Sequence, residues 1–273
     1  MPADGSLRLD DVRGFVFDVD GTLVHRRPGG GAQPQPGAVE VLERIRGSGR
    51  PLVLFTNGSH VAAASIARGL RRDGLPVADD EVLTPIDSAI SYLRRTHPGA
   101  RVMAFVTDAI RRRLVAADIA LTTAEDADVV LVAHVDAIDV EALERAARAI
   151  VRGARFLVGS YVPGYAGANG MIFSRGAMVA AAIAKVTSVR PKVVGKPSRP
   201  ALAELDDHLG LPTKELAVIG DDLAMDIRLG RLGGSRTVLV RSGISASIDP
   251  ARVPARHRPH AVVDGVADLI DHL

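Results

Sequence analysis

Short apolar runs alternate with segments of helical periodicity along most of the chain. Runs of four or five mostly apolar residues are typical of strands buried on both faces of a parallel sheet. Between them, apolar residues recur at helical spacing, as at Val41, Leu42 and Ile45. This alternation predicts an α/β fold with a parallel sheet. The strands expected in this first set are 14–17, 51–55, 216–219, 236–240 and 261–264.

A second alternation lies inside the first. It has expected strands at 101–106, 128–133 and 155–158, with expected helices at 86–93, 140–152 and 176–187. We therefore expect two domains: a core of residues 1–84 and 191–273, and an inserted α/β domain of residues 85–190.

Two segments interrupt the pattern. Residues 26–37, RRPGGGAQPQPG, are expected to be a flexible connector without regular structure. Residues 242–259 are expected to be a surface connection. A helix is expected from about Ser59 to Asp73, with Ser59 as one candidate for its N-cap.

The segment RGFVFDVDGTLV carries the first chemical signal. Asp18 and Asp20 follow the apolar run 14–17, and Gly21 lets the chain turn sharply after them. In an open parallel sheet, ligands bind at the carboxyl edge of the strands. Two neighbouring carboxylates repel unless a cation lies between them, and Mg²⁺ prefers such oxygen ligands together with a substrate phosphate. The motif alone fits an ordinary Asx turn as well.

Three further places follow strand-like runs and favour phosphate chemistry. Thr56, Asn57 and Gly58 combine a hydroxyl with backbone N–H groups that suit phosphate oxygens. Lys196, in VVGKP, is a compact cation with three donors. Asp221, Asp222 and Asp226 follow the run 216–219. Together these residues predict a magnesium and phosphate site.

The composition of the chain excludes several classes of binding partner and of chemistry. Lys and Arg number 34 against 32 for Asp and Glu, and no aromatics interleave with the arginines, so we expect no nucleic-acid partner. The chain has no cysteine, which excludes disulfides and thiolate chemistry. No signal-like segment or membrane-length apolar stretch is present, so we expect no membrane partner and a cytoplasmic location.

The four motifs resemble, in order, those of the haloacid dehalogenase superfamily of phosphohydrolases: DVDGT, TN, K and GDD with a later aspartate. Over a hundred residues separate Thr56 from Lys196. That separation resembles the NagD-like or 4-nitrophenylphosphatase type (class IIA), which has a large C2-type cap inserted in a Rossmann-like core. Further similar segments are PKVVGKPS, GDDLAMDI and VLVRSGIS.

The resemblance implies a mechanism and a set of roles. Asp18 would be the nucleophile that forms an aspartyl-phosphate, and Asp20 the general acid and base. Mg²⁺ would be held by the Asp18 carboxylate, the Asp20 backbone carbonyl and Asp221, with Asp226 or Asp222 orienting the ligands. Thr56, the backbone at Asn57 and Gly58, and Lys196 would bind the phosphoryl group.

The expected cap departs from the family pattern. GSYVP stands at 159–163 where relatives commonly have Thr-Asn-Pro-Asp, so Tyr161, Tyr165 and Asn169 are candidates to face the leaving group or simply pack the cap. His134 has no second imidazole or acid at ligand spacing, and we interpret it as structural.

We expect a phosphatase for a small phosphomonoester. Two alternatives stay open: a silent phosphate-binding protein, and a phosphotransferase or phosphomutase. A receiver-type signalling domain is disfavoured by chain length and by the Asp-x-Asp pair. A homodimer is one further expectation, since cap surfaces mediate dimers in some relatives.

Overall fold

The computed structural model describes residues 7–167 and 170–273. The chain forms two compact units, and each is considered by itself. The first contains the chain up to Thr56, Ala63–Leu83 and Leu205–Leu273; the second contains Asn57–Ala62 and Thr84–Glu204. The second unit thus includes the expected cap together with residues 57–62 and 191–204. The domain boundaries at 85 and 190 stay a prediction about where the cap is inserted.

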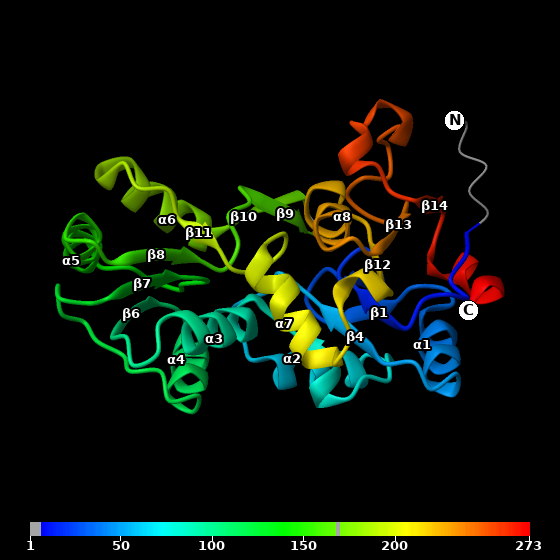
Figure 1. Ribbon diagram of the computed structural model, residues 1–273, viewed down its shortest axis with the longest axis horizontal. Coiled ribbons are helices and arrows are strands. Elements are labelled where there is room, and N and C mark those ends of the chain that lie inside the picture. Colours follow the sequence, from blue (N-terminus) through cyan, green and yellow to red (C-terminus); the bar gives the residue numbers. More distant parts are fainter. Residues whose placement is uncertain (1–6, 168–169) are drawn as a thin grey trace. The chain divides into compact units, whose positions relative to one another are not determined.

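A parallel six-stranded sheet forms the centre of the first unit, in the order β14-β13-β12-β1-β4-β5 (Figure 1). Its strands are β1 (Gly14–Phe17), β4 (Leu52–Phe55), β5 (Val82–Leu83), β12 (Leu216–Gly220), β13 (Arg236–Val240) and β14 (Ala261–Val263). The strands β1, β4 and β12 are buried along their whole length, as their uninterrupted apolar runs predict. The prediction of a parallel α/β fold is confirmed.

Helices cover this sheet because their apolar stripes match the strand faces. Val41, Leu42 and Ile45 of α1 pack in one buried cluster with Phe15 and Phe17 of β1. The helices are α1 (Ala38–Gly47), α2 (Ala63–Arg72), α7 (Arg199–Leu209), within which the boundary between the units falls, and α8 (Arg228–Gly233). Shorter helical turns are η1 (Asp79–Glu81), η2 (Thr213–Glu215), η3 (Leu223–Ile227), η4 (Pro250–Arg252), η5 (Ala255–His257) and η6 (Val266–His272).

The expectation of an irregular connector at residues 26–37 is wrong. Strands β2 (Val24–Arg26) and β3 (Ala32–Pro34) form an antiparallel hairpin in this region. Its turn contains Gly29, Gly30 and Gly31, all with positive φ (85°, 108° and 78°), a conformation that glycine adopts without strain. The same glycines that argued against a regular element therefore close one.

The helix expected from Ser59 begins at Ala63 instead. Residues 57–62 form a loop in the second unit, held by hydrogen bonds to residues distant in sequence. The Asn57 side chain accepts from the Lys196 backbone N–H (3.2 Å) and donates to the Lys196 carbonyl (3.4 Å). The Thr107 hydroxyl donates to the His60 carbonyl (2.9 Å). These tertiary bonds override the local preference for an early helix start.

The second unit has its own parallel sheet, in the order β11-β8-β7-β6. One buried cluster joins α3 and α4 to one face of this sheet, and another joins α5 and α6 to the opposite face, as Figure 1 also shows. Its elements are α3 (Pro85–Thr96), β6 (Val102–Phe105), α4 (Asp108–Val115), β7 (Val129–Val132), α5 (Val140–Val151), β8 (Arg155–Val158), α6 (Arg175–Thr187) and β11 (Lys192–Val193). A separate hairpin pairs β9 (Gly164–Gly167) with β10 (Gly170–Phe173).

Among the described residues, no helix combines the length and the apolar character that a bilayer span requires.

Candidate active site

Three carboxylates meet at the carboxyl edge of the first unit's sheet. Asp18 follows β1, Asp221 follows β12, and Asp226 lies in the turn η3; oxygen atoms of the three lie within 4.8 Å of one another. Strands β1 and β12 pair in register from Gly14 with Leu216 to Phe17 with Ile219, so the residues after them emerge side by side. This is the only group of three or more such ligands within the described residues.

Asp221 is fixed by partners from two other segments. The backbone N–H of Ile244 donates to its Oδ2 (2.7 Å), and the Ser245 N–H donates to its carbonyl (3.1 Å). The buried Thr22 hydroxyl lies 3.3 Å from Asp221 Oδ1 and 3.5 Å from Asp18 Oδ2. The carboxylate of Asp221, itself 5% exposed, is thus held in one orientation.

Glycines make room for these carboxylates. A Cβ at Gly243 would lie 1.9 Å from Asp221 Oδ2, and one at Gly21 would lie 2.5 Å from the same atom. A Cβ at Gly220 would lie 2.3 Å from the Asp226 carboxylate. Only glycine permits so close an approach of backbone and carboxylate.

Asp226 reaches the cluster through a π-helical turn. The N–H groups of both Asp226 and Ile227 donate to the Asp222 carbonyl, at 2.9 and 3.2 Å, which widens the turn. The Asp222 backbone N–H donates to Asp226 Oδ2 (3.1 Å). The Asp222 carboxylate caps the same turn by accepting from Ala224 N–H (2.7 Å). Asp222 therefore orients Asp226 from outside the three-carboxylate group.

Asp20 stands apart from that group. Its side chain is 44% exposed and pairs with Arg26 of the β2–β3 hairpin, with 2.5 Å from Arg26 Nε to Oδ1 and 3.4 Å from Nη2 to Oδ2. The Asp20 carboxylate is therefore more exposed than that of the buried Asp221.

The expected phosphate-binding residues divide between the units. Thr56 is buried at the end of β4 in the first unit, on the sheet edge that carries Asp18. Asn57, Gly58 and Lys196 belong to the second unit, where the Asn57 amide bonds to the Lys196 backbone at both N–H and carbonyl. Lys196 is 2% exposed. All four residues follow strands, but the helix start expected shortly after Thr56 lies at Ala63, and phosphate binding by these residues stays a prediction.

The candidates expected to face a leaving group are described only in part. Tyr161 lies just beyond β8 and is 41% exposed. Tyr165 belongs to β9, and Asn169 lies outside the described residues. Their roles stay a prediction.

Two features of the second unit are not evident in the sequence. The ring of His60 lies 5.8 Å from that of His134, centroid to centroid, although the two are far apart in the chain. Asp136 Oδ1 lies 3.7 Å from His134 Nε2. His134 therefore has an imidazole and an acid near it in space, but within the described residues the three do not form a group that could hold a metal ion, and the structural role of His134 stays a prediction. The β6 and β7 strands and the His60 loop bring these groups together.

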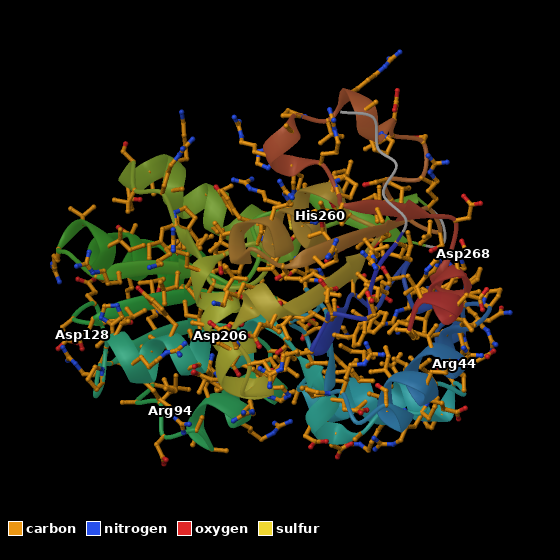
Figure 2. All side chains as sticks on the ribbon, turned by 45° about the vertical axis from the view of Figure 1, so that its right-hand side comes forward. Arg44, Arg94, Asp128, Asp206, His260 and Asp268 are labelled. Atoms are coloured by element: carbon orange, nitrogen blue, oxygen red, sulfur yellow. The ribbon has the colours of Figure 1, made fainter. Side chains whose placement is uncertain are left out.

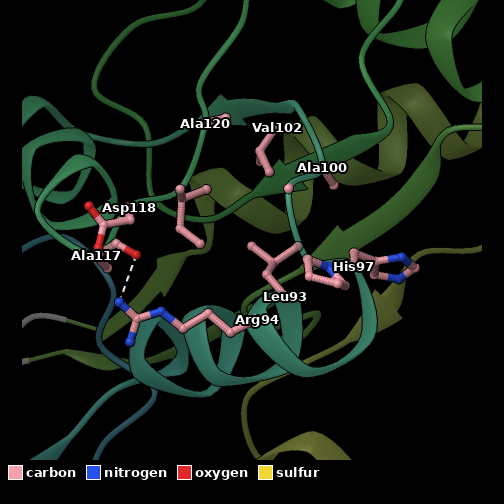
Figure 3. Close-up of a pocket in the computed structure, with 11 residues that line it drawn as sticks. Leu93, Arg94, His97, Ala100, Val102, Ala117, Asp118 and Ala120 are labelled. Atoms are coloured by element: carbon pink, nitrogen blue, oxygen red, sulfur yellow. Dashed lines mark hydrogen bonds between the residues drawn. The ribbon is translucent and has the colours of Figure 1, made fainter.

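A hollow of about 170 Å³ lies elsewhere in this unit, beside Leu93, Arg94, His97 and Val102 (Figure 3). Val102 is the first residue of β6, so the hollow is at the amino edge of the sheet. The Arg94 guanidinium there donates to the Ala117 carbonyl (2.8 Å). Because ligands of parallel sheets bind at the carboxyl edge, we do not assign it to the active site.

Comparison with known proteins agrees with this arrangement. Residues 15–120 match the family model of haloacid dehalogenase-like hydrolases, and residues 193–269 match a second model of HAD-like hydrolases. The ribonucleotide monophosphatase NagD of Escherichia coli is 30% identical over 262 residues, covering 94% of this chain and 98% of that protein. An acid sugar phosphatase of Staphylococcus epidermidis is 25% identical, covering 88% and 91%. The solved p-nitrophenyl phosphatase of Archaeoglobus fulgidus superposes with a TM-score of 0.84 at 27% identity, covering 96% and 100%.

Proposed function

Because the chain belongs to the haloacid dehalogenase-like hydrolases, of the NagD and 4-nitrophenylphosphatase type, and is a phosphomonoester hydrolase, we propose that it cleaves a small phosphomonoester through an aspartyl-phosphate on Asp18. The observation that carries the mechanism is the meeting of Asp18, Asp221 and Asp226 within 4.8 Å at the carboxyl edge of the sheet, next to strand β4, which Thr56 follows.

The carboxylate group fits Mg²⁺. Each of the three residues offers a carboxylate oxygen within 4.8 Å of the others, and Mg²⁺ prefers such oxygen ligands. Asp18, the Asp20 carbonyl and Asp221 would hold the ion, with Asp226 and Asp222 orienting the ligands. When bound, the ion would offset the repulsion between the carboxylates and the phosphate.

In the proposed first step, an Asp18 carboxylate oxygen attacks phosphorus in line. The bond from phosphorus to the ester oxygen breaks, and Asp20 donates a proton to the leaving alkoxide. In the second step Asp20 removes a proton from water, which attacks phosphorus. Phosphate leaves and the Asp18 carboxylate is restored. The exposed position of Asp20 supports this exchange of protons with substrate and water.

The remaining residues would bind the transferring group. Lys196 would supply positive charge, while the Thr56 hydroxyl and the backbone N–H groups near Asn57 and Gly58 would donate to phosphoryl oxygens. Residues 85–190 are proposed as the cap that selects the leaving group. Every catalytic position of the four motifs carries the residue that the mechanism requires. This favours an active phosphatase over a phosphate-binding protein without activity.

The test is phosphate release from a panel of phosphomonoesters by the purified full chain, with Mg²⁺ and then with EDTA. We expect magnesium-dependent release that Asp18→Asn abolishes, while exposed Asp10→Asn serves as the matched control. Release by Asp18→Asn at the wild-type rate would require another nucleophile. Transfer of phosphate to an added alcohol in preference to water would instead identify a phosphotransferase.

A further inference from the structure

The carboxyl edge of the second unit's sheet carries a row of polar groups in the order of its strands. Lys196 follows β11, Ser160 follows β8, His134 follows β7, and Thr107 follows β6. The paired backbones continue past the strands: Gly195 N–H donates to the Gly159 carbonyl (2.8 Å), and Gly159 N–H to the Val132 carbonyl (2.9 Å). The row is therefore held at one level by the sheet.

The far end of the row holds two imidazoles. The Thr107 hydroxyl secures the backbone of His60, whose ring lies 5.8 Å from that of His134 and is tilted by 59° to it. The Asn57 amide secures the other end of the same loop to Lys196. One loop thus connects the lysine end of the row with the histidine end.

Ser160, between these ends, is a hydroxyl without a partner. Its Oγ is buried, yet it has no hydrogen-bond partner among the described residues. A buried hydroxyl that forms no hydrogen bond costs free energy, and a ligand hydroxyl beside it would remove that cost.

We propose that Ser160, His134 and His60 bind the hydroxyl groups of a five- or six-carbon sugar or polyol phosphate whose phosphoryl group lies at Lys196. This inference rests on the proposed function, because it takes Lys196 as the phosphoryl-binding end. It assigns the leaving-group role to residues other than Tyr161, Tyr165 and Asn169.

The length of the row sets the size of the leaving group. Neighbouring strands are about 4.8 Å apart, so Lys196 and His134, two strands apart, are separated by about 10 Å. Each bond of an extended chain advances about 1.3 Å, so a glycerol ester spans about 6 Å from phosphorus and a six-carbon polyol ester about 10 Å. On this backbone spacing we expect a three-carbon ester to fall short of the histidines.

The charges near the histidines favour neutral hydroxyls over a second anion. Asp136 Oδ1 lies 3.7 Å from His134 Nε2 and 3.5 Å from an Arg175 guanidinium nitrogen. The positive charge of Arg175 offsets the negative charge of Asp136. A second phosphate or a carboxylate of the ligand at His134 would be repelled by the Asp136 carboxylate. Imidazoles that both donate and accept hydrogen bonds suit hydroxyl groups at this position.

The test compares kcat/KM for ribose 5-phosphate and glucose 6-phosphate with that for glycerol 3-phosphate, using 4-nitrophenyl phosphate as the reference in each enzyme. We expect wild type to favour the longer esters. In His134→Leu and His60→Leu, kcat/KM for the sugar phosphates should fall about tenfold relative to kcat/KM for 4-nitrophenyl phosphate. His134→Gln, in which an amide replaces the imidazole as donor and acceptor, should restore part of the ratio, and exposed His208→Leu should leave it as in wild type.

The outcomes separate the two proposals. No phosphate release from any ester would overturn the proposed function. Suppose that both leucine variants hydrolyse 4-nitrophenyl phosphate and keep the wild-type ratio of kcat/KM for sugar phosphate to kcat/KM for this reference. That result would overturn the histidine assignment alone. A preference for glycerol 3-phosphate, or for a nucleotide such as UMP, would overturn the sugar class. Equal losses on sugar and reference esters, with thermal unfolding as in wild type, would also count against a leaving-group role.

Discussion

Arg26 and Asp20 form a two-point ion pair that joins the β2–β3 hairpin to the loop after β1. The guanidinium approaches both carboxylate oxygens, at 2.5 and 3.4 Å, and restricts the rotamers open to Asp20. The proposed acid and base is therefore oriented by a residue from a hairpin six residues farther along the chain.

Replacing Arg26 by alanine should slow turnover while changing stability little. Both side chains are nearly half exposed, so the pair should contribute less than about 1 kcal/mol to the free energy of unfolding. Without it, Asp20 samples more orientations, and kcat should fall severalfold. Arg26→Lys keeps the positive charge but not the two guanidinium nitrogens that contact both carboxylate oxygens, so it should recover part of the loss in kcat. Wild-type kcat in Arg26→Ala would refute a positioning role.

Gly243→Ala should impair magnesium binding. The new methyl would lie 1.9 Å from Asp221 Oδ2, and the Gly243 φ is outside the left-handed region, so the effect is a clash with the carboxylate. We expect at least a tenfold higher Mg²⁺ concentration for half-maximal thermal stabilisation. Gly47→Ala, where a Cβ meets nothing within 4 Å, is the matched control. Equal magnesium responses in both variants would contradict the assignment.

Asn57→Leu should loosen the lysine loop. It removes both hydrogen bonds to the Lys196 backbone, and the loss should cost about 1 to 3 kcal/mol of unfolding free energy. Asn57→Asp keeps the acceptor for the Lys196 N–H and should cost less. Urea unfolding measures both values, and kcat/KM should fall in the same order. An Asp variant as unstable as the Leu variant would argue against the backbone bonds as the cause.

His260 should make stability depend on pH. Figure 2 labels His260 on the ribbon. Loss of water around its ring and the Arg231 and Arg236 guanidinium groups lower the pKa of His260, and the Thr237 N–H donates to its Nδ1 (3.0 Å), which requires that atom to be unprotonated. Below about pH 6.5 the unfolded chain takes up a proton that the folded ring resists. Stability should therefore be fully present above that pH and decline as pH falls toward the folded pKa.

The comparison for His260 is urea unfolding at pH 7.5 and pH 5.5. His260→Gln should lose less stability between the two values than wild type, and exposed His208→Gln should behave as wild type. A wild-type loss no larger than that of His260→Gln would show that His260 does not drive the dependence.

The sheets were predictable because their strands are buried on both faces, which leaves apolar runs such as Gly14–Phe17 and Leu216–Gly220. The β2–β3 hairpin was not, because a glycine-rich turn with positive φ has the same composition as a flexible linker. The helix start after Thr56 was misplaced because bonds from Asn57 and His60 to distant residues decide it.

In the three-carboxylate group, strand-end position predicted Asp18 and Asp221, while the membership of Lys196 in the site stays a prediction. The neighbours that fix Asp221 were not predictable, because Ile244 and Ser245 lie in a segment expected to be a surface connection. The His60 and His134 pair depends on which loop covers which strand end. Residue spacing along a chain does not contain that information.

The Asp221 carboxylate leaves no room for a side chain at Gly21 or Gly243. The residue types allowed at these three positions therefore depend on one another. If Asp221 is a magnesium ligand, a side chain at either glycine would displace its carboxylate, and both positions should stay glycine. A lineage that abandoned catalysis would be released from that constraint at both. In related sequences that keep this fold, glycine at both positions should therefore accompany a three-carboxylate group that still binds magnesium.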